Sequence, residues 1–169
     1  GGTVGGWGAG DDGMAGRVGG CGKDYPEGET EIVPGSAAAS GGAALLGAPL
    51  MHDVAVSSLS DLLTPWETIE KRLRAAAEAD FVICLYNPSS RKRSDYLERA
   101  CGMILDSRDP ETVCGIARNI GRDGESCQIL TLEQLKDTKV DMFSTVFIGN
   151  SRTTELNGRM VTPRGYKDV

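Results

Sequence analysis

The chain has 169 residues, of which 40% are hydrophobic and 25% charged, a composition typical of a globular protein and not of a disordered or fibrous one. No apolar run approaches the ~18 residues that a membrane-spanning helix needs, and the N-terminus lacks the pattern of a secretory signal, so we expect a soluble, cytoplasmic protein. The formal net charge of −6 argues against nucleic acid as a partner.

Charge is distributed unevenly along the chain. The first 80 residues hold 5 basic and 12 acidic side chains, whereas the remainder holds 13 basic and 12 acidic. An anionic ligand would therefore be bound by a local basic cluster in the second half, where Arg91, Lys92 and Arg93 are consecutive. The five cysteines include no C-x-x-C pair. Because two of them lie within strand-like runs, we expect neither a metal site nor a disulfide.

The N-terminal segment is rich in glycine. Eleven of the 23 glycines lie in the first 22 residues, so we expect residues 1–30 to be poorly ordered, with too little apolar surface to offset backbone entropy. Gly8, Gly10 and Gly13 formally match G-x-G-x-x-G, a dinucleotide-binding motif that follows a strand and opens a helix. No strand-like segment precedes Gly8, and this weighs against a nucleotide-dependent oxidoreductase.

The next part of the chain alternates between strand and helix patterns. EIVPG, residues 31–35, predicts a short strand that ends in a Pro-Gly turn. The small-residue segment after it predicts a helix over 37–50 that ends near Gly47 and Pro49. The alternating segment VAVSSLS, residues 54–60, predicts a second strand.

A helix start follows at Thr64. We expect Thr64 to be the N-cap, Pro65 to be the first helical residue, and Glu67 to complete a capping box. Apolar side chains then line one face of the helix at helical spacing: Trp66, Ile69, Leu73 and Ala76 or Ala77.

The second half repeats the alternation. FVICLY, residues 81–86, predicts a buried strand, and a helix is expected over about 90–106 with an inward face made of Leu97, Ala100, Cys101 and Ile104. Thr131 and Gln134 predict a capping box at a short helix. Further strands are predicted over 112–118, 127–132, 143–150 and within 158–166. Strands that alternate with helices predict an α/β fold.

Ligands of α/β proteins bind beyond the carboxyl ends of parallel strands. The segment LYNPSSRKR, residues 85–93, leaves such a strand end and reaches three cations near a predicted helix N-terminus. Cations there oppose the helix dipole, which favours anion recognition, although a solvated basic surface is equally compatible. Arg118 and Arg122 are candidate partners for a carboxylate. The predicted strand ends are Pro34-Gly35, Tyr86-Asn87 and Arg118-Asn119.

Longer segments resemble one family. The segment GAALLGAPLMHDVAVSSLSDLLTPWETIEKRLRAAAEADFVICLYNPSSRKR, together with ARNIGRDGE, VDMFSTVFIGNS and NGRMVTPRGY, resembles the precorrin-3B C17-methyltransferases of the tetrapyrrole methylase family, over residues 31–166. The resemblance implies S-adenosyl-L-methionine-dependent C-methylation of precorrin-3B at C17, with ring contraction, in cobalamin biosynthesis. It also implies a homodimer of two-domain subunits, with the cofactor between the domains and a precorrin-3B-type tetrapyrrole as substrate.

The resemblance implies a division of the chain and a set of site residues. Residues 31–51 correspond to the last strand and helix of the N-terminal cofactor domain, and residues 52–169 to the C-terminal α/β domain, whose mixed sheet is flanked by helices. It implies no metal site and identifies no catalytic base. The implied cofactor-binding residues are Gly10, Asp11, Gly13, Ala37, Ala38, Asn87, Asn119, Ser144 and Thr145. The implied substrate-binding residues are Arg91, Lys92, Arg93, Arg118 and Arg164.

The chain also departs from the family pattern. Most of the N-terminal domain, with its glycine-rich loop, has no counterpart in this sequence. The G-D-x-x-x-Y-G-M-A element corresponds only to GAGDDGMAG, where Gly8 replaces the aspartate and Asp12 the tyrosine, and Ala37 stands where a hydroxyl is usual. The sequence therefore leaves a second hypothesis open, an inactive fragment that acts only as a dimerisation or tetrapyrrole-binding domain.

Overall fold

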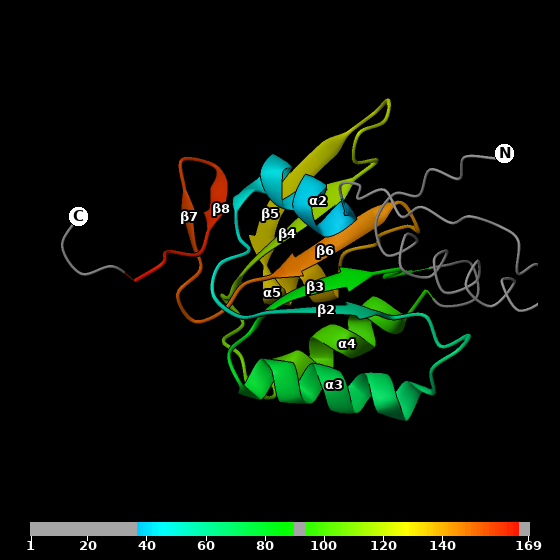
Figure 1. Ribbon diagram of the computed structural model, residues 1–169. Helices are drawn as coiled ribbons and strands as arrows, with labels where there is room; N and C mark the ends of the chain where they lie inside the picture. The colour runs from blue at the N-terminus through cyan, green and yellow to red at the C-terminus, as the bar shows by residue number, and fades with distance from the viewer. Residues whose placement is uncertain (1–36, 90–93, 166–169) are drawn as a thin grey trace, which may run out of the picture.

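The computed structural model describes residues 37–89 and 94–165, and Figure 1 shows them as a coloured ribbon. Its centre is a five-stranded mixed sheet with the order β2-β3-β6-β4-β5. β2 is parallel to β3, whereas β6 is antiparallel to both β3 and β4, so β2, β3 and β4 run in one direction. The strands are β2 (Val54–Ser58), β3 (Val82–Tyr86), β4 (Val113–Arg118), β5 (Ser126–Thr131) and β6 (Ser144–Ile148).

The predicted α/β fold with a mixed sheet is confirmed. Each of these five strands lies where the sequence pattern predicts it, with ends that differ by one or two residues. The strand predicted over 31–35 lies outside the described residues. No helix in the described part of the chain is both long and apolar enough to span a membrane.

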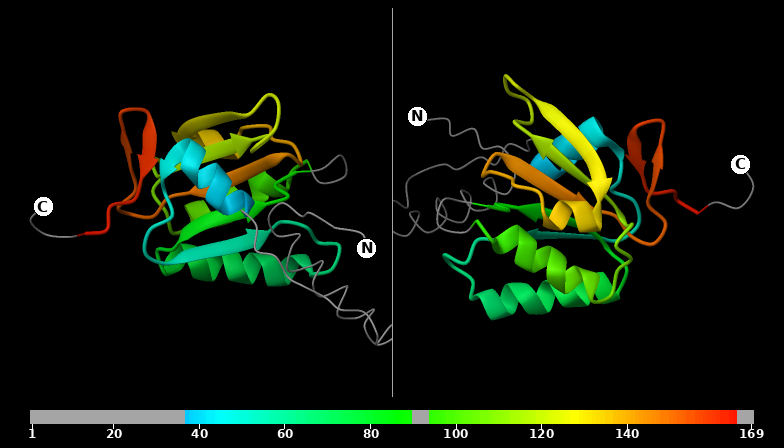
Figure 2. Two further views of the ribbon diagram at one scale, coloured as in Figure 1. Left: turned by 45° about the horizontal axis from the view of Figure 1, so that its top comes forward. Right: turned by 180° about the vertical axis from the view of Figure 1, so that it is seen from behind.

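Helices cover both faces of the sheet. Figures 1 and 2 show α2 on one face and α3, α4 and α5 on the other. The strand residues alternate accordingly: Ile83 and Leu85 pack in the cluster beneath α3 and α4, whereas Cys84 packs with Phe147 and Leu46 beneath α2. The helices are α2 (Ala38–Leu46), α3 (Trp66–Glu78), α4 (Tyr96–Leu105) and α5 (Leu132–Lys136).

The predicted capping box at the start of α3 is wrong. The N-cap is Pro65, which has ψ 142°, and no side chain makes a capping hydrogen bond. The first helical residue is Trp66, so Thr64 lies one residue too far from the helix for its hydroxyl to take the capping role. The predicted inward face is confirmed, because Ile69, Leu73 and Ala77 are buried.

The start of α4 also differs from the prediction. The helix begins at Tyr96, and Ser94 and Asp95 form a turn, whereas the sequence predicts a start near Ser90. The predicted inward residues of α4 are confirmed as buried: Leu97, Ala100, Cys101 and Ile104. The predicted cations Arg91, Lys92 and Arg93 lie outside the described residues.

The predicted capping box at α5 is confirmed. The Thr131 hydroxyl accepts a hydrogen bond from the Gln134 backbone N–H at 3.2 Å, and the Gln134 side chain accepts one from the Thr131 N–H at 3.0 Å.

Thr131→Ala is expected to lower the free energy of unfolding by about 1 kcal/mol. Thr64→Ala is expected to change it by less than about 0.5 kcal/mol. Urea denaturation of both variants tests this contrast, and equal losses would contradict it.

A smaller sheet joins the two ends of the described chain. β1 (Gly47–Ala48) follows α2 and pairs in parallel with β8 (Arg159–Val161), which forms a hairpin with β7 (Thr154–Leu156). The buried Thr162 hydroxyl donates to the Pro49 carbonyl at 2.7 Å and lies 2.8 Å from the Thr153 hydroxyl. These contacts fix the segment between α2 and β2 to the C-terminal hairpin.

Arg108 is a buried cation that links three elements. Its guanidinium donates to the carbonyls of Ala77 at 2.9 Å and Phe81 at 2.7 Å, and also to that of Gly149, which follows β6. Asp80 lies 3.7 Å from it and is the only carboxylate that forms an ion pair with it among the described residues. The guanidinium therefore joins the end of α3 and the start of β3 to the end of β6, and the Ala77 carbonyl also accepts the Asp80 N–H at 3.2 Å.

Candidate functional site

The ends of β2, β3 and β4 lie at one edge of the large sheet, together with the starts of β5 and β6. Ser58 is paired with Tyr86, and Arg118 is paired with Ser144. We call this the strand-end surface: the ends of β2, β3 and β4 together with the start of β6. Figure 1 shows it on the right, where the arrowheads of β2 and β3 point. It brings together the predicted site residues Asn87, Asn119, Ser144 and Thr145.

Asn87 and Asn119 turn the chain away from the sheet at corresponding places. Both have φ 51°, a left-handed conformation that asparagine tolerates better than most residues. The Asn87 carboxamide donates to the Ser58 hydroxyl at 3.0 Å, and that of Asn119 donates to the Gly124 carbonyl at 3.3 Å. These bonds hold Asn87 beside the end of β2 and close the loop from Asn119 to Gly124, so the backbone at each strand end has a defined position.

The N-terminus of α2 adjoins the same surface. Its N-cap, Ala37, has no side-chain capping bond, and the Ala39 N–H donates instead to the Tyr86 hydroxyl at 2.9 Å. Burial raises the pKa of Tyr86, and the Ala39 N–H offsets part of that rise, so the hydroxyl stays neutral. The predicted residues Ala37 and Ala38, both half-buried, therefore lie near the end of β3.

Ser144 and Arg118 are engaged by an acidic residue that sequence reasoning missed. Asp141 forms an ion pair with Arg118 and accepts hydrogen bonds from the Ser144 hydroxyl at 2.9 Å and the Phe143 N–H at 3.0 Å. The signal is local, because an aspartate that accepts from the N–H two residues later is a common turn pattern. At the strand-end surface, the positive charge of Arg118 is therefore balanced by the Asp141 carboxylate.

Thr145 presents a different kind of group. It is 4% exposed, and the alternation along β6 places its side chain on the same face as Phe147, beneath α2. Within the described residues its hydroxyl makes no hydrogen bond. No buried side-chain oxygen or nitrogen of the described residues lacks a hydrogen-bond partner, so the Thr145 oxygen itself is in contact with solvent and a ligand can reach it.

Of the other predicted residues, the structure describes only Arg164. Gly10, Asp11, Gly13, Arg91, Lys92 and Arg93 lie outside the described residues. Arg164 follows β8, which Figure 1 shows at the far end of the sheet from the strand-end surface. Its predicted role in binding the substrate stays a prediction.

Residues 9–136 match the family model described as Tetrapyrrole (Corrin/Porphyrin) Methylases. The chain is 49% identical to the "Probable cobalt-factor III C(17)-methyltransferase" of Salmonella typhimurium, over 82% of this chain and 57% of that protein. It is 44% identical to a protein of the same name from Methanocaldococcus jannaschii, over 83% of this chain and 59% of that protein.

A solved structure shows the same fold. The crystal structure of the methyltransferase CobJ superposes with a TM-score of 0.79 at 32% identity, covering 89% of this chain and 64% of that one. The chain thus spans less than two thirds of the length of each of these three proteins.

Proposed function

The chain belongs to the tetrapyrrole methylase family, and from this premise we propose that it takes part in the S-adenosyl-L-methionine-dependent C-methylation of a precorrin-3B-type tetrapyrrole at C17, with ring contraction, in cobalamin biosynthesis. The observation that carries the proposal is the strand-end surface, which gathers Asn87, Asn119 and Thr145 beside the N-terminus of α2. In this proposal residues 31–51 belong to the cofactor domain and residues 52–169 form the C-terminal domain.

The groups at the strand-end surface suit S-adenosyl-L-methionine. This cofactor carries a cationic sulfonium and an adenosine that binds through hydrogen bonds and packing. Thr145 offers a hydroxyl that makes no hydrogen bond within the described residues and that a ligand can reach, and the alanines that open α2 leave room for close packing. Arg118 is neutralised by Asp141, which removes a charge that would repel the sulfonium.

In this proposal, methyl transfer needs little acid or base catalysis by side chains. When bound, S-adenosyl-L-methionine supplies an activated methyl group together with its own leaving group. The protein then contributes mainly by holding the acceptor carbon in line with the methyl group, which supplies much of the rate. The hydrogen-bonded Asn87 and Asn119 and the docked N-terminus of α2 are suited to that task.

The alternative is a domain that binds a tetrapyrrole or a second copy of the chain without catalysing methyl transfer. One observation favours it: GAGDDGMAG departs from the family element. Cofactor binding separates the two functions, because only the first requires it.

We expect S-adenosylhomocysteine, the product form of the cofactor, to bind the purified chain with a micromolar dissociation constant in isothermal titration calorimetry. Thr145→Val is expected to weaken binding about tenfold, the equivalent of one lost hydrogen bond. The control is Thr154→Val, an exposed position on β7, which should leave affinity unchanged. A folded chain that gives no heat would overturn the methyltransferase proposal and leave the alternative.

A further inference from the structure

A groove of about 380 Å³ lies between the edge strand β2 and helix α3. Its floor is apolar and includes Leu73, Ala76 and Ile83. Consecutive residues of β2 line it, although their side chains alternate between the two faces of the sheet, so the groove follows the backbone edge of the strand. This edge pairs with no strand in the described part of the chain. We call this feature the β2–α3 groove.

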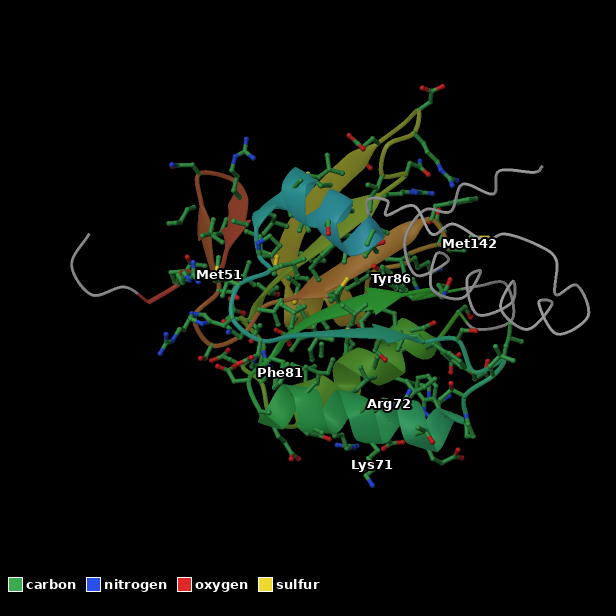
Figure 3. All side chains as sticks on the ribbon, in the orientation of Figure 1. Met51, Lys71, Arg72, Phe81, Tyr86 and Met142 are labelled. Atoms are coloured by element: carbon green, nitrogen blue, oxygen red, sulfur yellow. The ribbon has the colours of Figure 1, made fainter. Side chains whose placement is uncertain are left out.

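The polar groups of the β2–α3 groove are hydroxyls and one cation. Arg72, on α3, lies one turn before Ala76 and on the same side of the helix, so its guanidinium is at the groove. The neighbouring Lys71 does not line the groove, and Figure 3 shows its side chain pointing away from the sheet. The hydroxyls belong to Ser57, Ser58, Ser60 and Thr64.

Arg72 differs from the other arginines near it. Arg74, two residues later, binds the carboxylates of Glu70 at 3.2 Å and Asp106 at 2.7 Å, and Arg99 lies 4.0 Å from Asp95. Within the described residues Arg72 has no carboxylate partner, and no acidic residue lines the groove. A guanidinium beside hydroxyls and without a carboxylate, in a chain of net charge −6, is suited to bind an anion from outside the protein.

The groove is continuous with the strand-end surface. Ser58 belongs to both, because it ends β2 and its hydroxyl accepts a hydrogen bond from the Asn87 carboxamide at 3.0 Å. The same hydroxyl accepts the Ser60 N–H at 3.1 Å. A ligand whose ring lies against the strand-end surface can therefore extend a short side arm past Ser58 into the groove.

We propose that the β2–α3 groove is a subsite for one carboxylate side arm of the tetrapyrrole, which Arg72 binds with help from the Ser57 and Thr64 hydroxyls. The proposal rests on the proposed function, because a tetrapyrrole at the strand-end surface supplies the arm. The apolar floor accommodates the methylene groups of the arm, and the guanidinium at the rim binds its carboxylate.

The test is a fluorescence titration with uroporphyrin III, a tetrapyrrole with two carboxylate arms on each pyrrole ring, at one fixed low ionic strength. Arg72→Gln is expected to raise the dissociation constant about tenfold, since a hydrogen-bonded ion pair is lost. Lys71→Gln removes the same charge from a position outside the groove and is expected to raise the dissociation constant less than twofold. Both residues are exposed, so both variants should keep the melting temperature of the parent chain.

Equal dissociation constants for the two variants would overturn the subsite, as would failure of the parent chain to bind uroporphyrin III. Parallel titrations with S-adenosylhomocysteine separate this result from the proposed function. Arg72→Gln should leave that affinity unchanged. If the parent chain does not bind S-adenosylhomocysteine, methyl transfer is refuted, whereas an affinity for uroporphyrin III that depends on Arg72 would still support the subsite.

Discussion

Replacing Arg108 with methionine is expected to lower the free energy of unfolding by about 3–5 kcal/mol and the melting temperature by roughly 10 °C. The guanidinium is 4% exposed in its side chain and donates to the carbonyls of Ala77, Phe81 and Gly149. Methionine has no hydrogen-bond donor, so the Phe81 and Gly149 carbonyls lose the guanidinium in the interior, at about 1–3 kcal/mol each before water enters. The Ala77 carbonyl keeps the Asp80 N–H. Thermal and urea unfolding followed by circular dichroism measure the loss.

Arg74→Met is the matched control for this variant. Arg74 lies on α3 and also makes two ion pairs, but its side chain is 41% exposed. Exposed ion pairs contribute about 0–1 kcal/mol, so the loss should be several times smaller than for Arg108→Met. Losses of the same size would show that Arg108 acts only through charge and that its carbonyl contacts contribute nothing.

Gly149→Ala is expected to destabilise the fold by about 2–3 kcal/mol. A Cβ at this position would lie 2.6 Å from the Val113 carbonyl oxygen and 2.5 Å from the Thr153 Cβ. The first contact is with backbone that also accepts the Gly149 N–H at 2.9 Å, so neither strand end can move without losing that bond. Equilibrium unfolding in urea provides the measurement.

Gly102→Ala is expected to raise the free energy of unfolding, in contrast to Gly149→Ala. Gly102 lies within α4, and a Cβ there would meet nothing within 4 Å. Alanine is favoured over glycine inside a helix, so the free energy of unfolding of this variant should be higher by about 0.5–1 kcal/mol. If both glycine variants lost stability alike, the crowding at Gly149 would not be the cause of its loss.

The secondary structure could be predicted well where the signal is local. The buried run Phe81–Tyr86 predicts β3, and the spacing of Ile69, Leu73 and Ala77 predicts the inner face of α3, because burial imposes those periods on the chain. The start of α3 shows the limit of local reasoning. Thr64, Pro65 and Glu67 have the composition of a capping box, yet the extended Pro65 takes the N-cap position and the box does not form.

The partners of the charged residues could not be predicted, because they come from distant parts of the chain. In the sequence Arg118 is a cation after a strand, whereas the fold brings Asp141 to it from 23 residues away. Arg108 stands in a loop-like segment, and its acceptors lie 27, 31 and 41 residues away. The hydrophobic pattern predicts where the strands end. It does not predict that the antiparallel β6 lies between β3 and β4, because that order depends on pairings between distant segments.

The pairing of β1 with β8 has a consequence for how the chain folds. The bond from Thr162 to Pro49 joins residues 113 positions apart, so the loop that it closes contains all five strands of the large sheet. Closing so long a loop costs less entropy once the intervening sheet has folded. We infer that the segment between α2 and β2 is fixed in place late, and that during synthesis on the ribosome its attachment waits until residues 159–162 have emerged.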